Sequence, residues 1–263
     1  MNQSQLEQTN VLINECADQI FKFSPQLFIL ENETLPIMPK ALATSVLYKN
    51  NGNFYLITAS HVFKDHDYKK IGILSNDTFS YLHGFTLLSE DHENKIDLAI
   101  MKLAENFVVD IQKEYKFLDD SYIIKNHTYI NTQNYLMAGY PVHMSKYYDD
   151  TYRREQFILL TQPSNKNIYN KLKLNKDLHT LIDLERPRSF NNINYDSKIP
   201  KLYGMSGSAL WFIPSLEKHI FKLIGIMIEW HKDEKVTVST RIDAVLYYID
   251  NMIETLEEKA LKK

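Results

Sequence analysis

The chain has 263 residues and a formal net charge of −3, from 30 basic and 33 acidic side chains. No basic cluster with interleaved aromatic residues is present, and no stretch approaches the ~18 apolar residues of a membrane span, so we expect neither nucleic acid nor a membrane as a direct partner. The length allows one large β domain or two small ones, and 17 Tyr with 13 Phe can fill a sizeable core.

The cysteine content and the first residues of the chain indicate the cellular compartment. Cys16 is the single cysteine, so the chain can form no internal disulfide. Residues 1–5 lack the basic and then apolar pattern of a secretory signal peptide. Both features predict a cytoplasmic protein, because disulfides are typical of secreted chains.

An amphipathic helix is expected over about residues 4–22. Ser4 and Glu7 have the spacing of a capping box. One helical face then carries four apolar side chains, Leu6, Ile13, Ala17 and Ile20. We expect this helix to lie outside the β body that follows. It either packs against a barrel or docks to a partner, and packing is the favoured interpretation.

From Ala41 onward the pattern is typical of short β-strands. Asn51-Gly52 lies between the apolar segments 45–48 and 54–57 and predicts a hairpin. Further strands are expected at 71–74, 86–88, 98–103, 135–138, 157–161, 180–184, 209–213, 223–228 and 236–239. This succession predicts an all-β sandwich or a pair of barrels, with residues 107–134 as the link between two halves.

The remaining segments are two expected loops and a helix. Residues 164–179 and 185–201 are rich in Asn, Lys and Pro and are expected to form loops near Ser206. Apolar residues then recur at helical spacing from Ile242 to Leu256, which predicts a carboxy-terminal helix.

Glycine placement draws attention to Ser206. The chain has only seven glycines, and two of them, Gly204 and Gly207, flank this serine in a segment that precedes an apolar strand. Glycine serves where the backbone needs a positive φ or a close approach. We therefore expect a tight turn that aims the backbone N–H groups of Gly204 and Ser206 at one point, as an oxyanion hole does.

A serine nucleophile needs a base, and the base needs a group that orients it. His61 follows the apolar segment 54–58, and Asp97 stands near the start of the apolar segment 96–103. The chain order of these three residues is His, Asp, Ser, which is the order found in chymotrypsin-type enzymes and differs from that of subtilisins and α/β-hydrolases.

At this point the chain resembles the trypsin-like serine peptidases of the bacterial cytoplasmic type. The matching motifs are Thr58-Ala59-Ser60-His61-Val62, Asp97-Leu98-Ala99, Gly204-Met205-Ser206-Gly207-Ser208 and, more weakly, Met137-Ala138-Gly139-Tyr140-Pro141. The resemblance covers roughly residues 40–250 and implies an all-β fold of two six-stranded-type barrels. The implied parts are a helical extension (1–34), a first barrel with His61 and Asp97 (35–134), a second barrel with Ser206 (135–240) and a carboxy-terminal helix (241–263).

The resemblance implies a serine endopeptidase that forms an acyl-enzyme and needs no cofactor. Its protein or peptide substrate is expected to pair with the strand Ile228-Glu229-Trp230, beside Tyr203. Pro200 stands at the implied base of the specificity pocket; it has no charge, which favours apolar or medium-sized side chains over Arg and Lys.

The resemblance also bears on regulation. Met205 replaces the aspartate that, in secreted relatives, pairs with an amino terminus freed by clipping. We therefore expect a site that is either formed constitutively or ordered by an activating protein partner. By family-level analogy, bacterial proteins that resemble this chain often act in multi-component systems, including defence against phage.

Other interpretations of the same residues were weighed. Each motif alone fits an ordinary loop, a structural histidine or a strand-end aspartate, but their order and flanking strands agree. The main alternative is a protease-like module that binds peptides without cutting them, and an esterase on the same fold is the next. A hydrolase elbow fits less well, because Ser208 replaces its final glycine. His61 and His66, with Asp65 and Asp67 nearby, lack helical i, i+4 spacing, so no metal is expected.

Overall fold

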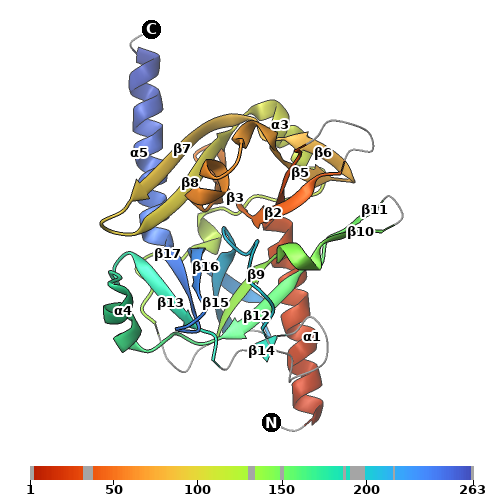
Figure 1. Cartoon of the computed structure of the whole chain (residues 1–263), viewed down its shortest axis with the longest axis vertical. Helices are drawn as coiled ribbons and strands as arrows, with labels where there is room; N and C mark the ends of the chain where they lie inside the picture. Colours follow the sequence, from red (N-terminus) through yellow and green to blue (C-terminus); the bar gives the residue numbers. More distant parts are fainter. Residues whose placement is uncertain are drawn as a thin grey trace.

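The computed structural model describes residues 3–31, 38–129, 134–148, 151–185, 188–189, 199–215 and 217–261. Figure 1 shows two curled β bodies, one above the other, with a long helix at each end of the chain. The prediction of an all-β fold of two barrels is confirmed. Within the described residues, no helix is long and apolar enough to cross a membrane.

The first β body consists of two antiparallel four-stranded sheets. One has the order β2-β1-β5-β6, with β1 (Gln26–Ile29), β2 (Lys40–Thr44), β5 (Ile71–Ser75) and β6 (Thr78–Tyr81). The other has the order β3-β4-β8-β7, with β3 (Val46–Asn50), β4 (Asn53–Thr58), β7 (Gly84–Asp91) and β8 (Ile96–Leu103). The predicted hairpin is confirmed: Asn51 and Gly52 both have positive φ and join β3 to β4.

The second β body is a seven-stranded antiparallel sheet of order β13-β17-β16-β15-β9-β12-β14. Its strands are β9 (Tyr135–Gly139), β12 (Phe157–Thr161), β13 (His179–Asp183), β14 (Arg188–Ser189), β15 (Ala209–Ser215), β16 (Ile220–His231) and β17 (Val236–Arg241). A short hairpin of β10 (Lys146–Tyr148) and β11 (Thr151–Arg153) extends to the side (Figure 1). Every strand predicted from residue 71 onward overlaps one of the observed strands.

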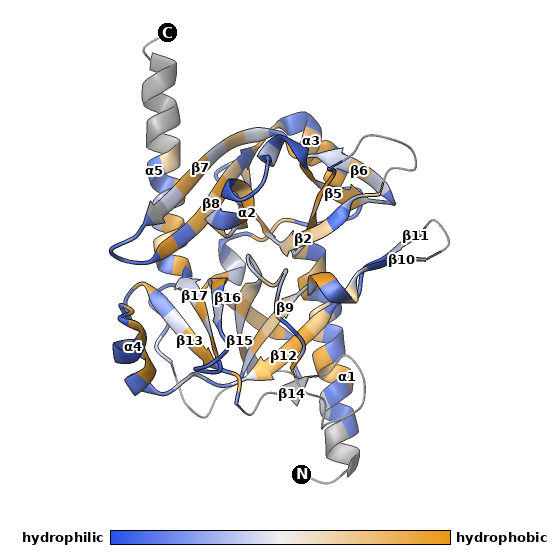
Figure 2. Cartoon of the chain, in the orientation of Figure 1, coloured by the Kyte–Doolittle hydropathy of each residue, from blue (hydrophilic) through white to orange (hydrophobic). Residues whose placement is uncertain are grey.

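The amino-terminal helix α1 (Gln3–Ile20) belongs to the core of the protein. Ile13, Cys16, Ala17 and Ile20 are buried and share one apolar cluster with Trp211 of β15. The predicted helix is confirmed, and so is the favoured interpretation that it packs against a barrel. Four apolar side chains on one face make it a packed element, as Figure 2 shows by its stripes of polar and apolar residues.

Two segments predicted as irregular contain short helices. The expected linker 107–134 overlaps α3 (Glu105–Ile111), and the expected loop 164–179 contains α4 (Lys166–Leu172), whose Tyr169 is buried. Each helix spans seven residues, too few for a clear periodic pattern. Most of the other expected loop, 185–201, lies outside the described residues.

The two remaining helices are α2 (Ser60–Lys64) and α5 (Ile242–Leu261). The first is a five-residue helix that directly follows β4 and was not predicted. The second confirms the expected carboxy-terminal helix, and its first turns pack on the second β body through Ile242, Val245 and Ile249.

Candidate active site

His61 and Asp97 contact each other at two points. The Nδ1 atom of His61 lies 2.6 Å from Oδ2 of Asp97, and the backbone N–H of His61 donates to Oδ1 at 2.9 Å. Asp97 is the second residue of β8, which pairs with β4, so the strand pairing brings the carboxylate beside α2. The sequence indicated that His61 lies at a strand tip. It lies instead within α2.

The hydrogen bond to Asp97 sets the state of the imidazole. A carboxylate accepts only, so Nδ1 carries the proton and Nε2 is left as an acceptor. The same hydrogen bond raises the pKa of His61 above its ordinary value, aided by the negative charge of Asp97, while partial burial opposes the rise.

Ser206 is the second residue of the second of two consecutive tight turns, which share Met205. The first turn is closed by Met205 N–H donating to Leu202 O at 3.0 Å, and the second by Ser208 N–H donating to Met205 O at 2.9 Å. Gly204 and Gly207 are the third residues of these turns, with φ of +91° and +86°. A type II turn requires a positive φ at this position, which explains both glycines.

The four peptide carbonyls between Tyr203 and Gly207 all accept hydrogen bonds, so the loop is restrained along its length. Tyr203 O accepts from Val142 N–H at 2.8 Å, Gly204 O from the Thr44 hydroxyl at 2.9 Å, Met205 O from Ser208 N–H at 2.9 Å, and Ser206 O from Thr44 N–H at 3.0 Å.

The N–H groups of the same loop divide into two kinds. Those of Met205 and Gly207 donate within the fold, the latter to Met227 O at 2.7 Å. Those of Gly204 and Ser206 have no acceptor among the residues that the structure describes. An N–H points away from the carbonyl of its own peptide group, and both of those carbonyls are held by other donors. Two N–H donors of the loop that carries Ser206 are therefore left without an acceptor among the described residues.

One cavity brings the candidate residues together. It has a volume of about 420 Å³, and its lining includes the predicted site residues His61, Tyr203, Gly204, Ser206, Ile228, Glu229 and Trp230. The rings of Tyr203 and Trp230 meet edge to face with centroids 6.0 Å apart. A second cavity of about 500 Å³ is also lined by His61, together with Asp97, Ile228 and Glu229 among others.

The strand beside this cavity has a free edge. β15 pairs with β16 only as far as Ile226, and Met227 is hydrogen-bonded to Gly207 and Ser208 of the serine loop, as we call residues 202–208. From Glu229 to His231, β16 pairs with β17 on its other side. Within the described residues, the edge of 228–230 that faces away from β17 therefore has no strand beside it, and an extended peptide could add there.

The Ser206 hydroxyl and the His61 ring line the same cavity without a hydrogen bond between them in the part of the chain that the structure describes. Contacts between nucleophile and base are often long in ligand-free sites and shorten when substrate binds. The lack of this hydrogen bond is therefore compatible with Ser206 as nucleophile and His61 as its base.

Several residues of this site were not predicted. Leu202 and Met227 line the cavity, whereas Pro200, the expected pocket base, is not part of its lining. Thr44 and Val142 hold the serine loop from outside it. A threonine at a strand end or a valine after a proline carries no local signal, so only the tertiary fold reveals these roles.

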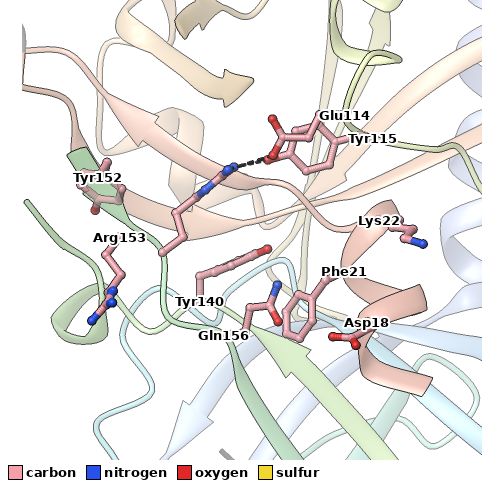
Figure 3. A pocket seen from close by; sticks show the side chains of 10 residues that line it. Asp18, Phe21, Lys22, Glu114, Tyr115, Tyr140, Tyr152, Arg153 and Gln156 are labelled. Atoms are coloured by element: carbon pink, nitrogen blue, oxygen red, sulfur yellow. Dashed lines mark hydrogen bonds and ion pairs between the residues drawn. The ribbon is translucent and has the colours of Figure 1, made fainter. Parts of the chain in front are cut away.

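A polar cavity of about 500 Å³ lies away from Ser206, between α1 and the segments around Glu114 and Arg154 (Figure 3). Arg154 forms an ion pair with Glu114 at 2.8 Å and donates to Leu74 O at 3.1 Å. Leu74 belongs to β5, and Arg154 follows β11, so these contacts join the two β bodies. The charges are paired with one another, which indicates a structural contact.

The candidates for metal ligation in the sequence were His61 and His66, with Asp65 and Asp67 nearby. Among the described residues, no group of three or more His, Cys, Asp or Glu side chains is arranged to hold a metal ion. The His66 ring lines the cavity beside His61, but Asp65 and Asp67 are not part of that lining.

Two solved structures are similar to this fold over most of the chain. A scabies mite inactivated protease paralogue aligns with a TM-score of 0.55 at 11% identity, over 90% of this chain and 96% of that one. A serine endoprotease from Yersinia pestis aligns with a TM-score of 0.54 at 17% identity, over 92% of this chain and 66% of that one. The chain has the chymotrypsin-like double-barrel fold.

This double-barrel fold is shared without close sequence similarity. Neither a protein-family model nor a curated protein sequence matches the chain. One of the two structures is named an inactivated protease and the other an endoprotease, so the double-barrel fold alone does not decide between cutting and binding. Function is therefore inferred from the residues around Ser206.

Proposed function

We propose that this protein is a serine endopeptidase, with Ser206 as nucleophile, His61 as general base and Asp97 as the residue that orients His61. The carrying observation is the pair of N–H groups at Gly204 and Ser206. They have no acceptor among the described residues, while the other polar groups of the four peptides between Tyr203 and Gly207 are bonded. Two free donors beside a serine hydroxyl suit the binding of an oxyanion.

The acylation step follows from these positions. The Ser206 Oγ attacks the carbonyl carbon of the scissile peptide bond while Nε2 of His61 takes the hydroxyl proton. The carbonyl oxygen becomes an oxyanion and accepts from the N–H groups of Gly204 and Ser206. Asp97 keeps the proton of Nδ1 in place and stabilises the imidazolium that forms.

Collapse of the tetrahedral intermediate completes the cycle in two stages. The C–N bond breaks, and His61 gives its proton to the leaving amine, which leaves an ester between Ser206 and the substrate acyl group. A water molecule then attacks this ester, with His61 again as base. The carboxylic acid product departs, and Ser206 regains its proton.

The substrate is proposed to be an extended peptide that adds to the free edge of β16 at 228–230. The cavity wall near Ser206 includes Leu202, Met227 and Trp230, which favour an apolar side chain before the scissile bond. Glu229 is the one carboxylate in this strand, and its side chain contacts His231 at 2.9 Å.

Regulation by a protein partner was expected as one of two possibilities. The hydrogen bonds that hold Tyr203, Gly204 and Ser206 support the other possibility, a serine loop that is formed without a trigger. A partner would then act on substrate access or delivery rather than by building the site.

A peptide-binding module without catalysis is the alternative. The similarity to a protein named an inactivated protease favours keeping it, because that protein has the same fold. A binder has no need of a base, an orienting carboxylate and two free N–H donors together, which favours the enzyme.

The test uses an unbiased peptide library and a panel of simple esters, with the wild type and Ser206→Ala. We expect new peptide termini with the wild type and none with the variant. Peptides retained by the protein but left intact would establish the binding module. Hydrolysis of esters alone would establish an esterase.

A further inference from the structure

Thr44 is the last residue of β2 in the first β body, yet it contacts the serine loop of the second. It is completely buried. Its backbone N–H donates to Ser206 O at 3.0 Å, and its hydroxyl donates to Gly204 O at 2.9 Å. The hydroxyl also accepts from Tyr140 N–H at 2.9 Å, and its carbonyl accepts from the Thr58 hydroxyl at 2.8 Å. Every polar group of this residue is therefore in use.

Gly204 needs such an external restraint. With no Cβ, a glycine rotates freely about φ and ψ, and its N–H direction changes with them. Val142 N–H holds the carbonyl before Gly204, and the Thr44 hydroxyl holds the carbonyl of Gly204 itself. The Gly204 N–H lies in the first of these two peptide planes, and the bond from Thr44 to the second plane restricts rotation between them at the Gly204 Cα.

The space below the loop leaves no ionic alternative. Met205 is buried and uncharged, and its Sδ lies 3.8 Å from the Ser208 hydroxyl. A Cβ added to Gly139 would lie 2.9 Å from both Met205 Sδ and Thr44 Oγ1, so these groups are closely packed. At this point beneath the loop, the restraint on Gly204 is therefore a neutral hydrogen bond from Thr44.

We propose that Thr44 is a positioning residue that orients the Gly204 N–H toward the oxyanion. Through this contact, catalysis depends on the relative position of the two β bodies. The inference rests on the proposed peptidase function. Thr44 itself does not touch the substrate, since its side chain is buried beneath the loop.

Three substitutions test this role by kinetics. Thr44→Val removes the hydroxyl and keeps the shape, and Thr44→Ser keeps the hydroxyl. Thr240→Val is the matched control, because Thr240 is equally buried and its hydroxyl has no partner among the described residues.

We expect Thr44→Val to lower kcat by about 10- to 100-fold with KM within about threefold, since a misdirected donor weakens the transition state more than the ground state. Thr44→Ser and Thr240→Val should stay within about threefold of the wild type. A kcat for Thr44→Val equal to that of the control would overturn the proposal. If Thr44→Val does not fold, Thr44→Cys replaces it, because a thiol fills the space but donates weakly.

A second readout needs no catalysis. Gly204 is the only glycine that follows a tyrosine, so ¹³C-carbonyl Tyr and ¹⁵N-Gly labelling yields one correlated amide signal. We expect this signal to shift or broaden in Thr44→Val and to be unchanged in Thr44→Ser. An unchanged signal in Thr44→Val refutes the positioning role. If the signal responds to Thr44→Val but the wild type hydrolyses no substrate, the peptidase proposal is refuted instead. Thr44 then remains the residue that restrains Gly204.

Discussion

The Asp97 carboxylate binds His61 through both of its oxygens, one at the imidazole Nδ1 and one at the backbone N–H. The two bonds fix the ring relative to its own main chain as well as its tautomer. The carboxylate remains partly exposed, with 28% of the side chain accessible, so it needs no full burial to act. This contact underlies the first three predictions below.

Asp97→Asn should reduce kcat/KM by on the order of 10⁴, by analogy with the established triad template. An amide can donate to Nδ1, which would place the imidazole proton on Nε2 and remove the base. Asp110→Asn is a suitable control, because Asp110 lies on α3 and its exposed side chain forms an ion pair with Lys113. A loss below tenfold for Asp97→Asn would contradict the role of Asp97.

The pH dependence of kcat/KM should report His61. Only the neutral imidazole accepts a proton, and the bond to Asp97 raises the pKa of His61 above its ordinary value of 6.5. Activity should therefore fall on the acid side with a midpoint above 6.5, and Asp97→Asn should move that midpoint down. A wild-type midpoint below 6.5 would contradict the assignment.

The same shift predicts a small effect on stability, with a defined sign. A raised pKa means that the folded state binds the proton of His61 more tightly than the unfolded state does. The resulting contribution to the free energy of unfolding is fully present below the unfolded pKa of His61. It is lost as the pH rises through the folded pKa. The side chain is 41% exposed, and solvent screening keeps this contribution small. Unfolding titrations of wild type and Asp97→Asn across this window measure it.

Cleavage should follow apolar or medium-sized residues rather than Arg or Lys. Leu202, Met227 and Trp230 give the cavity an apolar wall, and Glu229 contacts His231 instead of standing alone. Sequencing the products of a peptide library measures the preference. Efficient cleavage after Arg or Lys would contradict it and would point to Glu229 as the residue that selects the substrate.

Clipping of the amino terminus should not activate this protein. Ile13 on α1 is fully buried in the core, so Ile13→Ala should cost about 2–5 kcal/mol of unfolding free energy. Val11→Ala on the same helix is the control, since Val11 is 55% exposed and should change stability by less than about 0.5 kcal/mol. Removal of the residues before Pro36 should therefore destabilise the fold. An inert intact chain that gains full activity on this trimming would contradict the prediction.

Local sequence patterns predicted the hairpin at Asn51-Gly52 and the tight turn around Ser206, because backbone conformation is a local property. They did not predict the contact of Thr44 with Gly204, two residues that lie 160 positions apart. The packing of α1 was the favoured interpretation, but its partners, such as Trp211, were not predicted, because a helical face shows that it is apolar but not what covers it. Short helices such as α4 carry too few residues for a periodic signal.

The most direct measurement for the proposed chemistry is labelling with a fluorophosphonate, followed by mass-spectrometric mapping of the modified residue. A serine reacts rapidly only when a base and oxyanion donors activate it. We expect one adduct, on Ser206, with no adduct in Ser206→Ala and strongly slowed labelling in Asp97→Asn. A wild-type protein that stays unlabelled at Ser206, or one that is labelled at another serine, would contradict the assignment of Ser206 as the nucleophile.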